Sequence, residues 1–112
     1  AHIAVAAEAI AFAEKAGIDP ALALEILSGS AASSWMLQNR GPEMVKQTGK
    51  VTSAVDIFVK DLGSVLDAGR AMRRGLPLAA AAHQRCLDAS GAGPGREDDS
   101  QVVKVYRKMR EG

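Results

Sequence analysis

Apolar and polar positions along the chain recur with the period of about 3.6 residues that is typical of amphipathic helices. No segment alternates with the period of two that predicts a strand. Glycine, proline and serine interrupt the pattern where helices end or begin, which predicts helices over residues 1–16, 20–28, 34–41, 53–74, 77–91 and 99–110. Short connections between them predict one all-α domain, a compact multi-helix bundle spanning residues 1–112.

Local signals place several of these helix ends. Asp19-Pro20 predicts an N-cap followed by proline at the first position of the second helix. Gly41-Pro42 predicts the end of the third helix, because proline lacks the backbone N–H that continues the hydrogen-bond ladder. Ser53, with Asp56 three residues later, resembles a capping box at the start of the fourth helix, and Gly75 predicts its end.

The fourth predicted helix carries the residues that most invite a functional interpretation. Lys60 lies opposite its apolar face, and Asp61 lies on the border, where we expect a partly buried carboxylate. Asp56 stands four residues before Lys60, so an ordinary surface ion pair is the alternative interpretation of this lysine. The apolar face comprises Val55, Phe58, Leu62, Val65, Leu66, Gly69 and Met72.

The first predicted helix has almost no polar face and no good N-cap residue. We therefore expect it to be the continuation of a longer helix, with a further domain upstream of Ala1. Ile3, Ile10 and Phe12 would then be exposed without their partner domain, and the chain should self-associate. Its many alanines would allow close packing against several neighbouring helices.

Composition and charge narrow the possible functions. A formal net charge of +1 gives no overall reason to expect nucleic acid as a partner, and no apolar run is long enough to span a membrane. Cys86 is the only cysteine, which excludes an internal disulfide and is typical of a protein in the reducing cytoplasm. We expect its small side chain to be buried in the core. His2 and His83 stand far from one another in the sequence, so no metal site is predicted.

The residues alone allow more than one role for Trp35 and for the basic residues near the C-terminus. Trp35, the only tryptophan, lies in a short helix with few apolar neighbours, where it could pack in the core or form one wall of a ligand pocket. The basic end at Arg107, Lys108 and Arg110 suits the negative terminus of the last helix. It lacks the interleaved aromatic residues of a nucleic-acid surface.

An ordered set of short motifs resembles the 3-hydroxyacid dehydrogenase family, in particular the C-terminal helical domain of 3-hydroxyisobutyrate dehydrogenase and its relatives. Residues 53–62 are most similar to its L-threonate dehydrogenase branch. The set covers nearly the whole chain and comprises Ala7-Glu8-Ala9, Ala16-Gly17-Ile18-Asp19, Ser34-Trp35, Gly41-Pro42-Glu43-Met44, Lys60-Asp61-Leu62-Gly63 and Gly93-Pro94-Gly95-Arg96-Glu97-Asp98-Asp99-Ser100.

The resemblance implies the helical half of a two-domain enzyme with the architecture of 6-phosphogluconate dehydrogenase, whose Rossmann domain is absent here. The intact enzyme would transfer hydride between NAD or NADP and a small hydroxyacid such as 3-hydroxyisobutyrate, tartronate semialdehyde or threonate. Lys60 and Asp61 match the family's cofactor motif, and Trp35 matches a substrate-pocket tryptophan. The catalytic lysine would lie upstream of Ala1, so this chain alone should be inactive.

The resemblance also implies a cytoplasmic homodimer or higher homo-oligomer, with this domain closing the cleft and forming the dimer. Many relatives carry phenylalanine seven residues before the lysine, where this chain has Ser53, and this difference leaves the choice of hydroxyacid open. The rival interpretation is a free-standing helical module for oligomerisation or interaction, without catalysis, for which the alanine-rich first helix would supply the contact face.

Overall fold

Six α-helices and two short 3₁₀ turns make up the computed structural model, which describes the backbone of residues 1–111 and all side chains except those at positions 94 and 108–112. The described residues form no strand, only an isolated bridge between Ala54 and Asp98. The predicted all-α fold is therefore confirmed. The elements are α1 (His2–Lys15), α2 (Pro20–Ser28), α3 (Trp35–Lys46), α4 (Val55–Ala71), α5 (Pro77–Gly91), η1 (Pro94–Arg96), η2 (Asp99–Val102) and α6 (Val103–Glu111).

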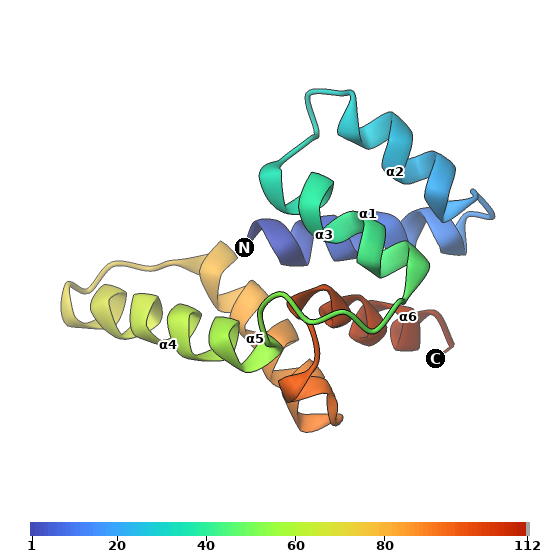
Figure 1. Cartoon of the computed structure of the whole chain (residues 1–112). Helices are drawn as coiled ribbons and strands as arrows, with labels where there is room; N and C mark the ends of the chain where they lie inside the picture. Colours follow the sequence, from blue (N-terminus) through green and yellow to red (C-terminus); the bar gives the residue numbers. More distant parts are fainter. Residues whose placement is uncertain (112) are drawn as a thin grey trace.

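Helix α1 lies at the centre, packed against α2, α3, α5, η2 and α6 (Figure 1). Its small side chains let these neighbours approach closely, as expected. The prediction that Ile3 and Ile10 are exposed is wrong, because both are completely buried in the domain's own core and contribute roughly 1.5–3 kcal/mol each. Phe12 is 74% exposed, as predicted.

Helix α3 does not end at Gly41-Pro42 as predicted but continues to Lys46. Proline removes one backbone hydrogen bond, whereas continuing the helix buries Met44 completely. Gly41 is buried because the absence of a Cβ lets α3 approach Leu24 of α2. The helix ends where Gln47 adopts a left-handed conformation, with φ of 54°.

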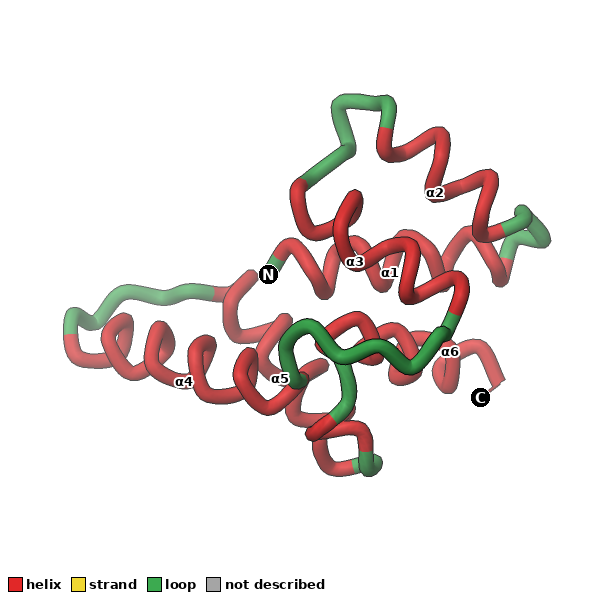
Figure 2. Tube along the Cα trace, viewed as in Figure 1, coloured by secondary structure: helices red, strands yellow, loops and turns green. Residues whose placement is uncertain are grey.

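Helices α4 and α5 pack against one another, and the C-terminal half of α4 projects from the rest of the molecule together with the segment that leads back to α5 (Figures 1 and 2). Val55, Leu62 and Gly69 are buried as predicted, but Val65 and Met72 of the same predicted face are exposed. Val65 belongs to the C-terminal half of α4 and Met72 is its C-cap residue. The helix ends at Ala71, earlier than predicted.

The start of α4 is fixed by residues far along the chain. Figure 2 shows the irregular segment 47–54 running from the end of α3 to the start of α4. The predicted capping box at Ser53 is wrong: Ala54 occupies the N-cap position and its side chain makes no capping hydrogen bond. Instead, the backbone N–H of Val55 donates to the carbonyl of Glu97 at 3.0 Å, and that of Asp99 donates to the carbonyl of Ser53 at 2.6 Å.

Helix α6 is tied to the core by Arg107. Its guanidinium donates to the Glu14 carboxylate at 2.7 Å and to the Met44 carbonyl at 2.7 Å, which joins α6 to α1 and α3. Arg107 therefore anchors α6 to the core rather than serving only as a charge at the helix end, and the side chains of Lys108 and Arg110 lie outside the described residues.

Candidate functional site

Lys60 and Asp61 occupy the second turn of α4, and both side chains are exposed. The expected partial burial of Asp61 is wrong, because the contact with α5 runs along a different side of the helix. Gly63, which the helical pattern places opposite the apolar face, lies beside His83 of α5: a Cβ at Gly63 would stand 3.6 Å from Nε2 of His83. Among the described side chains, none forms an ion pair with Lys60.

The alternative interpretation of Lys60, an ion pair with Asp56, is therefore wrong. Asp56 instead accepts a hydrogen bond from the Ser90 hydroxyl of α5 at 2.6 Å. Its carboxylate also lies against Gly95, where a Cβ would come within 2.7 Å of it. Asp56 thus ties the start of α4 to the end of α5, and the Lys60 ammonium remains available to a ligand.

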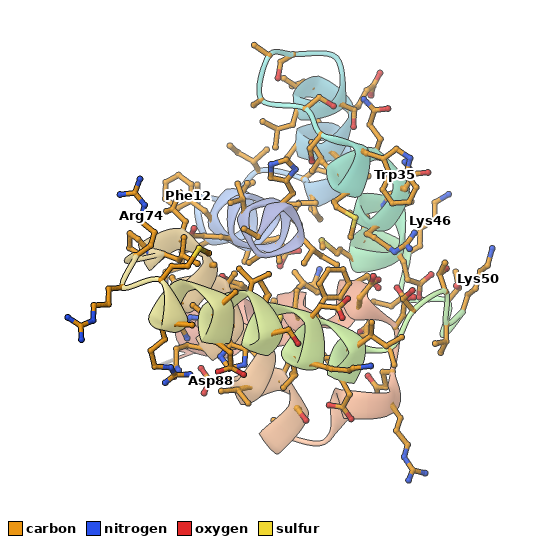
Figure 3. All side chains as sticks on the ribbon, turned by 90° about the vertical axis from the view of Figure 1, so that its left-hand side faces the viewer. Phe12, Trp35, Lys46, Lys50, Arg74 and Asp88 are labelled. Carbon is orange, nitrogen blue, oxygen red and sulfur yellow. The ribbon has the colours of Figure 1, made fainter. Side chains whose placement is uncertain are left out.

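Trp35 is the first residue of α3 and is 63% exposed, so it does not pack in the core. The Ser34 hydroxyl caps the helix by accepting from the N–H of Leu37 at 3.0 Å. The Arg40 guanidinium carbon lies 5.3 Å from the centroid of the indole ring, within the range of a cation–π contact. Figure 3 shows Trp35 above α4, at the same edge of the molecule as Lys46 and Lys50.

Arg40 in turn forms a buried ion pair that the sequence analysis missed. Its Nε donates to Asp99 at 2.8 Å, and the two side chains are 11% and 1% exposed. Burial raises the pKa of Asp99 to about 6, although the Arg40 charge opposes the shift. The second carboxylate oxygen of Asp99 has no hydrogen-bond partner. The two residues are 59 positions apart, so no local spacing signals this pair.

Asp98 organises the backbone beside this ion pair. Its carboxylate accepts hydrogen bonds from the N–H groups of Thr52, at 2.6 Å, and Ser100, at 3.2 Å, and from the Ser100 hydroxyl. Burial opposes ionisation of Asp98, but these hydrogen bonds outweigh it and lower its pKa. Asp98 is the N-cap of the short turn η2, where its side chain accepts from the N–H of Ser100.

Two cavities border α3. One, of about 270 Å³, is mostly apolar and lies between α1 and the segment joining α2 to α3; its lining includes Val5, Leu27 and Leu37. The other, of about 180 Å³, is polar and is lined in part by Arg40 and Lys46. Neither of these two cavities is lined by Trp35 or Lys60. No hydrogen bond, ion pair or ring contact among the described residues joins Trp35 to Lys60 or Asp61.

The remaining candidate groups are structural. Cys86 is buried on α5, as predicted, and burial raises the pKa of its thiol to about 11. Within the described part of the chain, no three His, Cys, Asp or Glu side chains converge as metal ligands would. None of the helices described has the length and apolar content that crossing a membrane requires.

Comparison with known proteins places this arrangement among oxidoreductase domains. A family described as "NAD-binding of NADP-dependent 3-hydroxyisobutyrate dehydrogenase" matches residues 1–106. L-threonate dehydrogenase from Cupriavidus necator is 51% identical over 105 residues, which cover 94% of this chain and 35% of that protein. The 2-hydroxy-3-oxopropionate reductase of Escherichia coli K12 is 31% identical over 108 residues, covering 96% of this chain and 37% of that protein.

The fold agrees with a solved structure of the same group. The crystal structure of 3-hydroxyisobutyrate dehydrogenase from Salmonella typhimurium matches with a TM-score of 0.91 and 48% identity, over 93% of this chain and 36% of that one. The chain therefore spans about a third of the length of the proteins it resembles.

Proposed function

Because this chain belongs to the NAD-binding domain family of NADP-dependent 3-hydroxyisobutyrate dehydrogenase, we propose that residues 1–112 are the helical domain of an NAD(P)-dependent hydroxyacid dehydrogenase. The single observation that carries the proposal is the 51% identity to L-threonate dehydrogenase along nearly the whole chain. The domain would form one side of the cleft in which cofactor and hydroxyacid meet.

The residues of α4 suit a dinucleotide in their chemistry. The Lys60 ammonium is exposed and has no ion-pair partner among the described residues, so it can donate hydrogen bonds to an anionic or carbonyl group of the cofactor. The adjoining Asp61 carboxylate can accept from a ribose hydroxyl or an amide. When bound, the nicotinamide ring supplies the hydride chemistry. The role of Lys60 and Asp61 is to hold and orient it.

Trp35 would form a wall on the substrate side. An exposed aromatic residue at the rigid first turn of a capped helix provides a flat apolar surface at little entropic cost. The substrate class we favour is a small hydroxyacid of the threonate type, because several L-threonate dehydrogenases are 44–51% identical to this chain. The general acid and base, a lysine in the family, would lie outside residues 1–112, so we expect no turnover from the chain alone.

Assembly and location follow from the same proposal. We expect a cytoplasmic homodimer or higher homo-oligomer, supported by the exposure of Phe12 and Val5 on the central helix. The same exposure favours the second candidate function, an oligomerisation module without catalysis. Activity in a complete enzyme separates the two candidates.

A chimera tests the proposal. In this chimera, residues 1–112 replace the matching segment of Cupriavidus necator L-threonate dehydrogenase. The chimera should oxidise L-threonate with NAD or NADP, because this domain would complete the cleft. The matched control is the same enzyme truncated before the segment, which should show no turnover. A soluble, folded chimera that binds the cofactor but leaves L-threonate and related hydroxyacids unchanged would contradict the proposal.

A further inference from the structure

We propose that Arg40 is a positioning residue, which holds the Trp35 indole in place from a buried anchor at Asp99. The inference deepens the proposed function and rests on it only in giving Trp35 a substrate to meet. The observations behind it are the 2.8 Å ion pair from Arg40 to Asp99 and the 5.3 Å separation between the guanidinium and the indole ring.

The anchor is rigid at its inner end. Asp99 is 2% exposed and belongs to η2, whose N-cap is Asp98. Its backbone N–H is fixed by the carbonyl of Ser53 at 2.6 Å. Arg40 thus reaches from α3 to a carboxylate that the fold holds in one place, and a guanidinium hydrogen-bonded through Nε has a restricted orientation.

The Trp35 indole is the part of this arrangement that needs support. The Trp35 backbone is fixed by the Ser34 cap and by its carbonyl, which accepts from the Asn39 amide at 2.8 Å, but its side chain is 63% exposed. An indole with so little surrounding protein would sample several rotamers. The planar Arg40 guanidinium, held by its ion pair with Asp99, favours one of these rotamers by stacking and cation–π attraction.

The consequence is a preorganised aromatic wall. A wall that is already ordered does not lose rotamer freedom when the substrate binds, so the Asp99–Arg40 pair would lower the KM for the hydroxyacid without taking part in the chemistry. The pair would act through Trp35, because the Arg40 guanidinium contacts the indole ring while its hydrogen-bond partner is the buried carboxylate.

The fluorescence of the only tryptophan tests this inference on the 112-residue chain without any assay of activity. Arg40→Gln should lower the steady-state anisotropy of Trp35 and increase its quenching by acrylamide. Arg40→Lys should restore these values only in part, because an ammonium keeps the charge but has no planar face. Asp99→Asn, which retains the side-chain volume, should loosen Trp35 in the same direction as Arg40→Gln.

The matched control is Arg107→Gln, which breaks another partly buried arginine–carboxylate pair, with Glu14, away from Trp35. It should leave the anisotropy and quenching of Trp35 unchanged while circular dichroism reports a folded chain. Unchanged Trp35 fluorescence in Arg40→Gln, or equal loosening by Arg107→Gln, overturns the inference. If Arg40→Gln does not fold, Asp99→Asn decides by the same readout.

A second arm separates this inference from the proposed function. In the chimeric L-threonate dehydrogenase, Arg40→Gln should raise the KM for L-threonate more than it lowers kcat. Suppose that Arg40→Gln lowers the anisotropy of Trp35 in the 112-residue chain but leaves the KM of the chimera unchanged. Arg40 would then still be a positioning residue, and the substrate role of Trp35 would be contradicted. If Arg40→Gln leaves the fluorescence of Trp35 in the 112-residue chain unchanged while the chimera is active, the positioning role is overturned and the proposed function stands.

Discussion

At the scale of single residues, the molecule separates charges that serve the fold from charges available to a ligand. Asp98 and Asp99 are buried and partnered, whereas Lys60 and Asp61 are exposed on α4. The motif containing Lys60 could be found in the sequence because its residues are adjacent. The Arg40–Asp99 pair could not, since it depends on how η2, far along the chain, packs against α3.

Asp99 predicts a pH dependence of stability. Its pKa is raised from 3.8 to about 6 by burial, so the folded chain holds this proton more tightly than the unfolded chain does. Folding takes up a proton between about pH 4 and pH 6, and the contribution of Asp99 to stability falls as pH rises through that window.

Asp99→Asn removes this titration. The unfolding free energy of the wild type minus that of the variant should therefore fall by roughly 1–3 kcal/mol from pH 4 to pH 7 and then stay constant. Urea denaturation of both proteins at intervals of pH measures the difference. Parallel stability curves for the two proteins would show that Asp99 titrates normally.

At the scale of elements, the sequence predicted correctly those helix ends that are fixed by residues next to them in the chain. Asp19 caps α2 by accepting from the N–H of Ala21, with Pro20 as the first helical residue, as the sequence indicated. The ends that depend on distant contacts were predicted wrongly. Packing of Met44 carries α3 past Pro42, and Glu97 rather than Ser53 receives the first N–H of α4.

The turn between α4 and α5 makes Gly69 sensitive to substitution. A Cβ there would lie 3.0 Å from the Arg74 carbonyl oxygen and 2.7 Å from Leu76 Cδ1. Gly69→Ala should lower the unfolding free energy by about 1 kcal/mol, because overpacking exceeds the gain in helix propensity.

Gly91→Ala provides the control for that substitution, since Gly91 also lies in a helix but a Cβ there meets nothing within 4 Å. It should be neutral or stabilise by up to about 1 kcal/mol. Urea denaturation measures both variants. Equal stability of Gly69→Ala and Gly91→Ala would mean that the turn adjusts without cost.

At the scale of the whole molecule, the central helix α1 packs against the α2–α3 pair, which carries Trp35, and against α5, which in turn packs on α4 with Lys60 (Figure 1). The order of motifs along the chain predicted the family, and the comparisons confirm it. The cofactor-facing role of α4 remains a proposal.

Lys60→Ala in the chimeric L-threonate dehydrogenase tests that role most directly. If the ammonium orients the nicotinamide cofactor, kcat/KM for L-threonate should fall by about 100-fold, as expected when reacting groups are misplaced. Lys104→Ala removes an exposed lysine on α6 that pairs with Glu97, and it should leave kcat/KM unchanged. A Lys60→Ala chimera with the kcat/KM of its parent would contradict the account.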